Sequence, residues 1–167
     1  MRVLAIDASL RNTGVAVVDG GNGATRALYY GTIHNRAALR SSSCLVAIRD
    51  QLAALIREHE PDSCALESVI YVQSYKTAIL LGAARGAAIL AAAEMGLPVF
   101  EYAPKRIKQA TVGQGGAGKN QVAFMVRALL GLTETPGDDA ADALAIGLTH
   151  LRAQQVARLG LPGAKQI

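Results

Sequence analysis

The chain has 167 residues, 51% of them hydrophobic and 18% charged, with a formal net charge of +4 and an isoelectric point near 9.3. This composition excludes a disordered protein, and the length favours a single domain over residues 1–167, because two domains of this total size would have small cores. The positive charge permits an anionic partner without requiring one.

The predicted elements are strands at 3–6, 14–19, 25–34, 63–69 and 98–102, and helices at 39–60, 73–95, from 104, at 119–130 and at 138–155. A hairpin turn at 20–23 joins the second and third strands, and a glycine-rich loop at 113–118 separates two helices. Three consecutive strands followed by alternating helices and strands predict an α/β fold. We expect a five-stranded mixed sheet, with a three-strand antiparallel meander and parallel strands, flanked by helices.

Cysteine, histidine and hydropathy patterns exclude several classes of protein. Cys44 and Cys64 lie in apolar segments without CxxC spacing, which is typical of buried thiols in a reducing, cytoplasmic compartment. The three histidines are scattered, so no zinc site is predicted. We recognise no secretory signal. The apolar run 78–93 contains Arg85 and is shorter than the roughly 20 residues of a membrane span, so we interpret it as a buried helix.

Two acidic residues come where predicted strands end. Asp7 follows the apolar run 3–6, and Glu67 lies in the fourth strand. Right-handed crossover places the fourth strand parallel to the first, so both acids are expected at the same edge of the sheet. For Asp7 alone, a turn-initiating role ahead of Ser9 and Thr13 is an equally good interpretation.

A second pair of acids opens the last helix. Asp139 and Asp142 lie three residues apart and so on one face, with Asp138 expected as the N-cap. Acids near a helix N-terminus also complement its dipole, which accounts for one or two of them. However, the rest of this helix is apolar, and like charges in an apolar setting repel each other. Oxygen ligands that converge in this way favour a hard cation, Mg²⁺ or Mn²⁺, and two such ions would support phosphodiester hydrolysis.

Ordered motifs along nearly the whole chain carry a family resemblance. They are Asp7 with Arg11, Thr13 and Gly14; PDSCALE at 61–67; LGAARGAAILAAA at 81–93; PVFEYAP at 98–104; IKQ at 107–109 with Val112 and Gly113; Lys119 with Gln121 and Val122; MVRALL at 125–130; and DAADALAIGLTH at 139–150. This series resembles the RuvC family of bacterial Holliday junction resolvases, which have a ribonuclease H-like fold.

The resemblance implies a metal-dependent endonuclease that cuts four-way DNA junctions as a homodimer and works with the RuvA and RuvB branch-migration proteins. The same resemblance implies that the catalytic metal ligands are Asp7, Glu67, Asp139 and Asp142. It also implies that Lys108 and Lys119 lie near the scissile strand. The chain departs from the family at Ala8 and Ser9, where Pro-Gly is usual. Ile70 and Tyr71 also stand where an aromatic side chain is expected to probe the junction.

Further basic and aromatic residues fit DNA contact. Lys105, Arg106 and Lys108 lie within four residues, and such a run is either a solvated face or, beside a nuclease site, a set of phosphate contacts. Tyr71 has the chemistry to stack on an unpaired base, or it is a half-buried loop residue.

Two other functions compete with the nuclease. GQGGAGKN at 113–120 nearly matches a P-loop, but Asn120 replaces the Ser or Thr that holds Mg²⁺ and no buried strand precedes it. We interpret this segment as a loop that orders on DNA, and keep an actin- or sugar-kinase-like phosphotransferase as the alternative. A junction-binding module without catalysis is a third candidate, and the intact set of acids argues against it.

Overall fold

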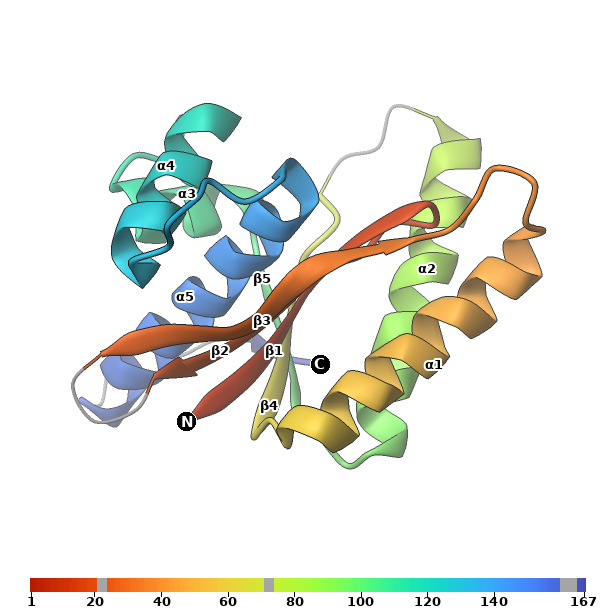
Figure 1. The fold of residues 1–167 in the computed structure, drawn as a ribbon, viewed down its shortest axis with the longest axis horizontal. Coiled ribbons are helices and arrows are strands. Elements are labelled where there is room, and N and C mark those ends of the chain that lie inside the picture. The colour runs from red at the N-terminus through yellow and green to blue at the C-terminus, as the bar shows by residue number, and fades with distance from the viewer. Residues whose placement is uncertain (21–23, 71–73, 160–164) are drawn as a thin grey trace.

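The computed structural model describes residues 1–20, 24–70, 74–159 and 165–167, so the centre of the predicted hairpin turn and Tyr71 lie outside the described residues (Figure 1). Its elements are β1 (Arg2–Asp7), β2 (Asn12–Gly20), β3 (Thr25–His34), α1 (Ser41–His59), β4 (Ser63–Glu67), α2 (Tyr75–Glu94), β5 (Val99–Tyr102), α3 (Pro104–Val112), α4 (Lys119–Leu130), α5 (Asp138–Arg158) and β6 (Lys165–Gln166). Every predicted helix and strand is present, with ends that shift by a few residues.

The strands form one mixed sheet in the order β3-β2-β1-β4-β5-β6. β1, β2 and β3 pair antiparallel, while β4 and β5 continue from β1 in parallel, as the sequence predicts. β6 adds a two-residue antiparallel pairing to β5 that was not predicted. A segment so short has no detectable alternation of apolar residues, and only its contact with β5 makes it a strand.

Helices cover both faces of the sheet (Figure 1). On one face, side chains of β1 and β2 such as Val3 and Val18 pack with α3, α4 and α5. On the other, Leu4, Val15 and their neighbours pack with α1 and α2. Because successive side chains of a strand point to opposite faces, the continuous apolar run in β1 supplies both cores.

α5 is buried along most of its length because it lies between the sheet and α3 and α4. This position explains why the helix is apolar on nearly all sides, a pattern typical of enclosed helices. Its contact with the sheet is close: a Cβ added at Gly147 would lie 2.8 Å from Val18 Cγ2. The helix that carries two of the four acids is therefore held firmly against β1 and β2.

The prediction that α2 is a buried helix is only partly right. Four alanines are buried, at positions 84, 88, 91 and 92, while Tyr75, Ile79 and Leu90 are exposed. Among the described residues, α2 alone is long and apolar enough to cross a membrane, with 22% of that apolar window buried in the fold. An alanine-rich helix has no strong polar face, so its sequence does not reveal which side is covered.

Candidate active site

Asp7 and Glu67 come together because β1 and β4 are parallel neighbours. Their pairing runs from Val3 opposite Ser63 to Ile6 opposite Leu66, and each acid is the next residue of its strand. Both carboxylates are therefore placed at the carboxyl edge of the sheet, as predicted. The nearby turn is held by Thr13, whose hydroxyl bonds the backbone of Ser9, so its bonding does not involve the Asp7 side chain.

The first turn of α5 reaches the same edge because Gly14 has no side chain. Gly14 is paired with Asp7 in the sheet, and a Cβ added there would lie 2.0 Å from the carbonyl oxygen of Asp139. Any larger residue would displace the start of α5. This contact brings the helix that carries Asp139 and Asp142 beside Asp7.

The expected N-cap role of Asp138 is wrong. Gly137 is the N-cap, Asp138 is the first helical residue, and no side chain caps this end. The one-residue shift leaves Asp139 and Asp142 in the same three-residue relationship. The acids still lie near the positive end of the helix dipole, which favours negative charge.

A cavity of about 340 Å³ joins three of the four predicted acids to two lysines. Its polar lining comes from Asp7, Glu67, Asp142, Lys108 and Lys119. The apolar lining includes Ile107 and Ile146, which exclude water from part of the wall. Asp139 does not line the cavity.

Burial and mutual repulsion disfavour the charged forms of these acids. The pKa of Asp7 is raised from 3.8 to about 7, first by burial and then by Asp142, Glu67 and Asp139. Burial likewise raises the pKa values of Glu67 and Asp142. Lys119 acts in the opposite direction, and its Nζ lies 3.7 Å from Asp142 Oδ2. The cavity therefore holds more buried negative charge than its lysines neutralise.

This donor set fits a hard divalent cation. Carboxylate oxygens are the preferred ligands of Mg²⁺ and Mn²⁺, and a cation would relieve the repulsion that raises these pKa values. Within the described residues, no three His, Cys, Asp or Glu side chains are close enough to form a ready-made cage. Asp7, Glu67 and Asp142 line the cavity without forming such a cage.

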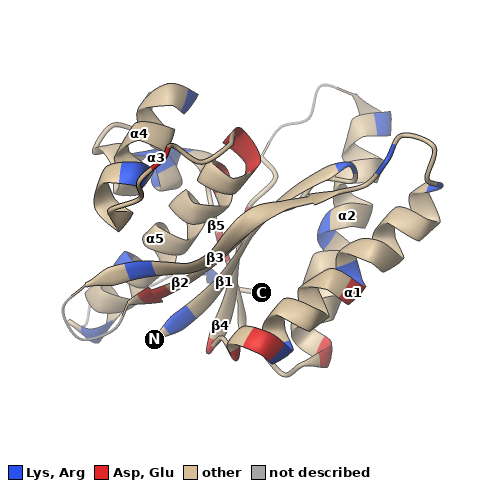
Figure 2. Cartoon of the chain, viewed as in Figure 1, with Lys and Arg blue, Asp and Glu red and all other residues tan. Residues whose placement is uncertain are grey.

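The structure separates the predicted basic residues into three places. Lys108 on α3 and Lys119 at the start of α4 face the carboxylates, and Figure 2 shows basic residues on these helices near the acidic start of α5. Lys105 packs over Gly115 in the glycine-rich loop. Arg106 lies 5.3 Å from the centre of the Tyr102 ring and lines a separate hollow with Arg152. Arg106 is thus placed away from the carboxylates.

The segment after β4 borders the site. Ile70 is 68% exposed and, with Ala8 and Glu67, lines a second hollow of about 250 Å³. Tyr71 lies outside the described residues. An exposed isoleucine beside the acids is the kind of apolar side chain that DNA-binding proteins insert between bases.

The glycine-rich loop is not a P-loop. It follows helix α3, whereas a P-loop follows a buried strand. Gly113 ends α3 with a positive φ of 86°, and Gly118 is the N-cap of α4, with its N–H donating to Gln121 Oε1 at 2.8 Å. Gly113 and Gly118 therefore form helix ends. This geometry removes the support that the near P-loop gave to a phosphotransferase.

Sequence reasoning missed the roles of two residues at this site. One is Gly14, whose need for close approach has no local signal. The other is Arg85 on α2, whose Nη1 donates to the carbonyl oxygen of Glu67 at 2.6 Å. The available signal was a single charged residue within the apolar run 78–93, although it does not reveal the partner.

The family model for the crossover junction endodeoxyribonuclease RuvC matches residues 3–150 of the chain. The chain belongs to the RuvC family. It is 58% identical over 151 residues to the RuvC of Akkermansia muciniphila and 50% identical over 149 residues to that of Halorhodospira halophila. These alignments cover 90% and 89% of both partners.

Solved structures agree with this assignment. Thermus thermophilus RuvC in complex with a Holliday junction substrate superposes with a TM-score of 0.90 and 34% identity, covering 100% of this chain and 99% of that one. The yeast mitochondrial Holliday junction resolvase, at 14% identity and a TM-score of 0.62, shares the fold. The predicted α/β fold and family resemblance are therefore confirmed.

Proposed function

We propose that this chain resolves four-way DNA junctions by paired symmetric nicks, and that Asp7, Glu67, Asp139 and Asp142 are its metal-binding acids. The observation that carries the proposal is the convergence of three of these acids with two lysines around one cavity, in a chain of the RuvC family. One sheet with a core on each face supports treating residues 1–167 as a single nuclease domain.

The four acids would hold two Mg²⁺ ions, for which Mn²⁺ is a suitable substitute. Such ions, when bound, activate a water molecule and neutralise charge that develops on the scissile phosphate. The protein supplies ligands at the ends of rigid elements: β1, β4 and the first turn of α5. Rigid placement matters because hydrolysis of this kind depends on positioning and electrostatics more than on a nucleophilic side chain.

Lys108 and Lys119 bind and orient the phosphate backbone beside the acids. Both face the cavity. The ion pair between Lys119 and Asp142 is longer than a hydrogen bond, so the ammonium group can leave Asp142 and bind a phosphate oxygen. Lys105, Arg106, Ile70 and Tyr71 are proposed as outer DNA contacts. Such contacts provide affinity and salt dependence, while the acids provide the chemistry.

We propose that the chain acts as a homodimer through α2. Tyr75 and Ile79 on this helix are 92% and 71% exposed, and a Cβ at Gly82 or Gly86 would meet no atom within 4 Å. An uncovered apolar helix face with small residues allows a second backbone to approach closely. Two subunits would provide two sites, as paired nicks require.

Three further expectations concern the partners and the location of the chain. The family resemblance implies RuvA and RuvB as partners. A cytoplasmic location agrees with two buried, unpaired cysteines, Cys44 and Cys64, because cytoplasmic thiols remain reduced. We expect no membrane partner, since subunit contact accounts for the apolar surface of α2.

Cleavage of a labelled four-way junction tests the proposal. Glu67→Gln should bind the junction with unchanged affinity in EDTA and produce no nicks with Mg²⁺, because the neutral amide is a poor ligand for a hard cation. Mapping both nick positions on mobile and fixed junctions separates paired symmetric cutting from random nicking. Nicking by Glu67→Gln at the wild-type rate would remove Glu67 from the mechanism, and binding without nicking by the wild type would favour a non-catalytic module.

A further inference from the structure

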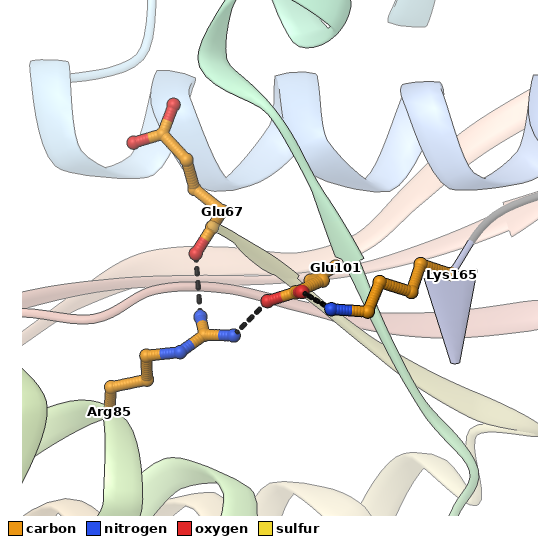
Figure 3. Close-up of polar contacts among 4 residues, drawn as sticks. All are labelled: Glu67, Arg85, Glu101 and Lys165. Atoms are coloured by element: carbon orange, nitrogen blue, oxygen red, sulfur yellow. Dashed lines mark hydrogen bonds and ion pairs between the residues drawn. The ribbon is translucent and has the colours of Figure 1, made fainter. Parts of the chain in front are cut away.

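Arg85 connects α2 to the backbone of Glu67 from the face of the sheet opposite α5. Its guanidinium donates to the Glu67 carbonyl at 2.6 Å and to Glu101 Oε2 at 2.8 Å (Figure 3). Figure 3 also shows the Glu67 carboxylate pointing away from Arg85, toward α5. Arg85 thus holds the main chain of Glu67 and leaves its carboxylate free.

The Glu67 carbonyl needs this partner because it lies where the sheet ends. Pairing of β4 with β1 stops at Leu66 opposite Ile6, one residue before Glu67. On the other side, the N–H of Ser68 still donates to the Tyr102 carbonyl at 2.8 Å. Arg85 therefore satisfies a backbone acceptor at the strand end.

Glu101 orients the guanidinium and also forms an exposed ion pair with Lys165. Lys165 Nζ lies 2.9 Å from Glu101 Oε1, while Arg85 binds the other oxygen (Figure 3). The side chains of Arg85 and Glu101 are 14% and 19% exposed, whereas Lys165 is 74% exposed. Charge-assisted bonds shielded from water are strong and directional, so the Arg85–Glu101 pair matters more than the exposed lysine.

We propose that Arg85 is a positioning residue for junction cleavage, which fixes the end of β4 so that the Glu67 carboxylate faces Asp7 and Asp142. The inference rests on the proposed role of Glu67 as a metal ligand. A planar guanidinium suits two acceptors at a defined angle, and a lysine ammonium does not reproduce that fork. Small displacements of a catalytic group are costly, because its orientation sets the reaction geometry.

Four variants of the full-length protein test this inference: Arg85→Met, Arg85→Lys, Glu101→Gln and Lys165→Met. Each is measured for single-turnover cleavage across a Mg²⁺ titration, for junction binding in EDTA and for thermal unfolding. The Mg²⁺ concentration at half-maximal rate is the decisive readout, because simple tethering of α2 to the sheet would lower stability without changing it.

Arg85→Met should cleave about 10- to 100-fold more slowly at fixed Mg²⁺, require more Mg²⁺, and bind the junction as the wild type does. Arg85→Lys should recover only part of this loss. Glu101→Gln keeps Arg85 and should lose about three- to tenfold, since only the orientation of Arg85 is loosened. Lys165→Met is the matched control and should match the wild type in all three measurements.

Wild-type cleavage and Mg²⁺ dependence in both Arg85→Met and Glu101→Gln would overturn the inference. If Arg85→Met does not fold, Glu101→Gln decides alone. Glu67→Gln, assayed in parallel, separates the two proposals. An active Glu67→Gln enzyme contradicts the metal-ligand role itself, whereas an inactive one beside a fully active Arg85→Met contradicts only the positioning role.

Discussion

Two polar groups on α5, the half-buried Asp142 and the buried His150, have opposite environments. Asp142, in the first turn, shares a cavity with Asp7 and Glu67, and the pKa values of all three acids are raised. His150, about two turns further on, is fully buried and bonds Ser63 Oγ at 3.0 Å and Tyr102 Oη at 2.8 Å. At one end of the helix, neighbouring acids repel each other. At the other end, the histidine has a hydrogen-bond partner for each ring nitrogen.

This difference separates groups retained for function from groups that stabilise the fold. A neutral histidine with one donor and one acceptor is fully matched by two hydroxyls, so its burial costs little. Buried like charges without full compensation reduce stability and are retained where a ligand will compensate them. The comparison predicts that mutations in the acidic site and at His150 will have opposite effects on stability and activity.

Asp7→Asn should produce the largest change. We expect junction cleavage to fall about 1000-fold or more, equivalent to about 4 kcal/mol of transition-state stabilisation. In EDTA at pH 8 the same variant should be more stable than the wild type by roughly 2–4 kcal/mol, because a buried carboxylate with a raised pKa is removed. Chemical unfolding measures this gain, and Asp50→Asn on the exposed face of α1 is the control. Lower stability of Asp7→Asn would contradict the claim that the Asp7 carboxylate destabilises the metal-free protein.

His150→Ala should show the reverse pattern. Removing the ring leaves a cavity and two hydroxyls without partners, so the free energy of unfolding should fall by about 3 kcal/mol. Cleavage by the folded fraction, measured below the unfolding transition, should stay within about twofold of the wild type, since His150 lies outside the proposed site. A large loss of rate in fully folded protein would place His150 in the mechanism.

Gly14→Ala should move one end of α5 and spare the other. The added methyl would overlap the Asp139 carbonyl, so the first turn must shift and cleavage should fall about 10- to 100-fold, with junction binding retained. Gly147→Ala is the matched control: it crowds Val18, three residues from His150, and should lower stability more than specific activity. Equal losses of activity in both variants would show that α5 responds as a whole.

His150 and Asp7, which lies beside the first turn of α5, should also oppose each other in the pH dependence of stability. Burial lowers the pKa of His150 from 6.5 to about 4, so between these values the unfolded chain binds more protons and stability rises with pH. The pKa of Asp7 is raised from 3.8 to about 7, so the folded chain binds more protons there and stability falls with pH.

Removing one of these groups should therefore reveal the pH dependence that the other contributes. In EDTA, Asp7→Asn should have a slope of unfolding free energy more positive than the wild type, and His150→Gln one more negative, each by about 1.4 kcal/mol per pH unit between pH 4.5 and 6. Unfolding curves at several pH values measure both slopes. Identical slopes in the three proteins would contradict the assigned shifts.

Lys119→Ala should have the smallest effect. We expect junction affinity to fall about threefold to tenfold and the slope of its salt dependence to decrease by about one, because one phosphate contact is lost. Arg127→Ala, at the far end of the same helix, is the control and should keep the wild-type slope. An unchanged slope for Lys119→Ala would mean that this lysine does not reach the DNA.

The sequence by itself determined the elements, their order and most of the candidate site. The apolar runs, the helical spacing and the breaks at Pro61 and Gly96 are local properties, and they predicted the mixed sheet and the placement of Asp7 and Glu67 at its edge. The spacing of Asp139 and Asp142 likewise put both on one helix face. These inferences succeed because periodicity within an element is set by its own geometry.

Only the tertiary structure decided how these elements meet. It placed Gly14 against the backbone of Asp139, joined Arg85 to the Glu67 carbonyl and turned Arg106 away from the acids. It also left the apolar face of α2 uncovered. Such contacts join residues that are distant in the chain, and they depend on the packing of whole elements, which no local pattern of residues specifies.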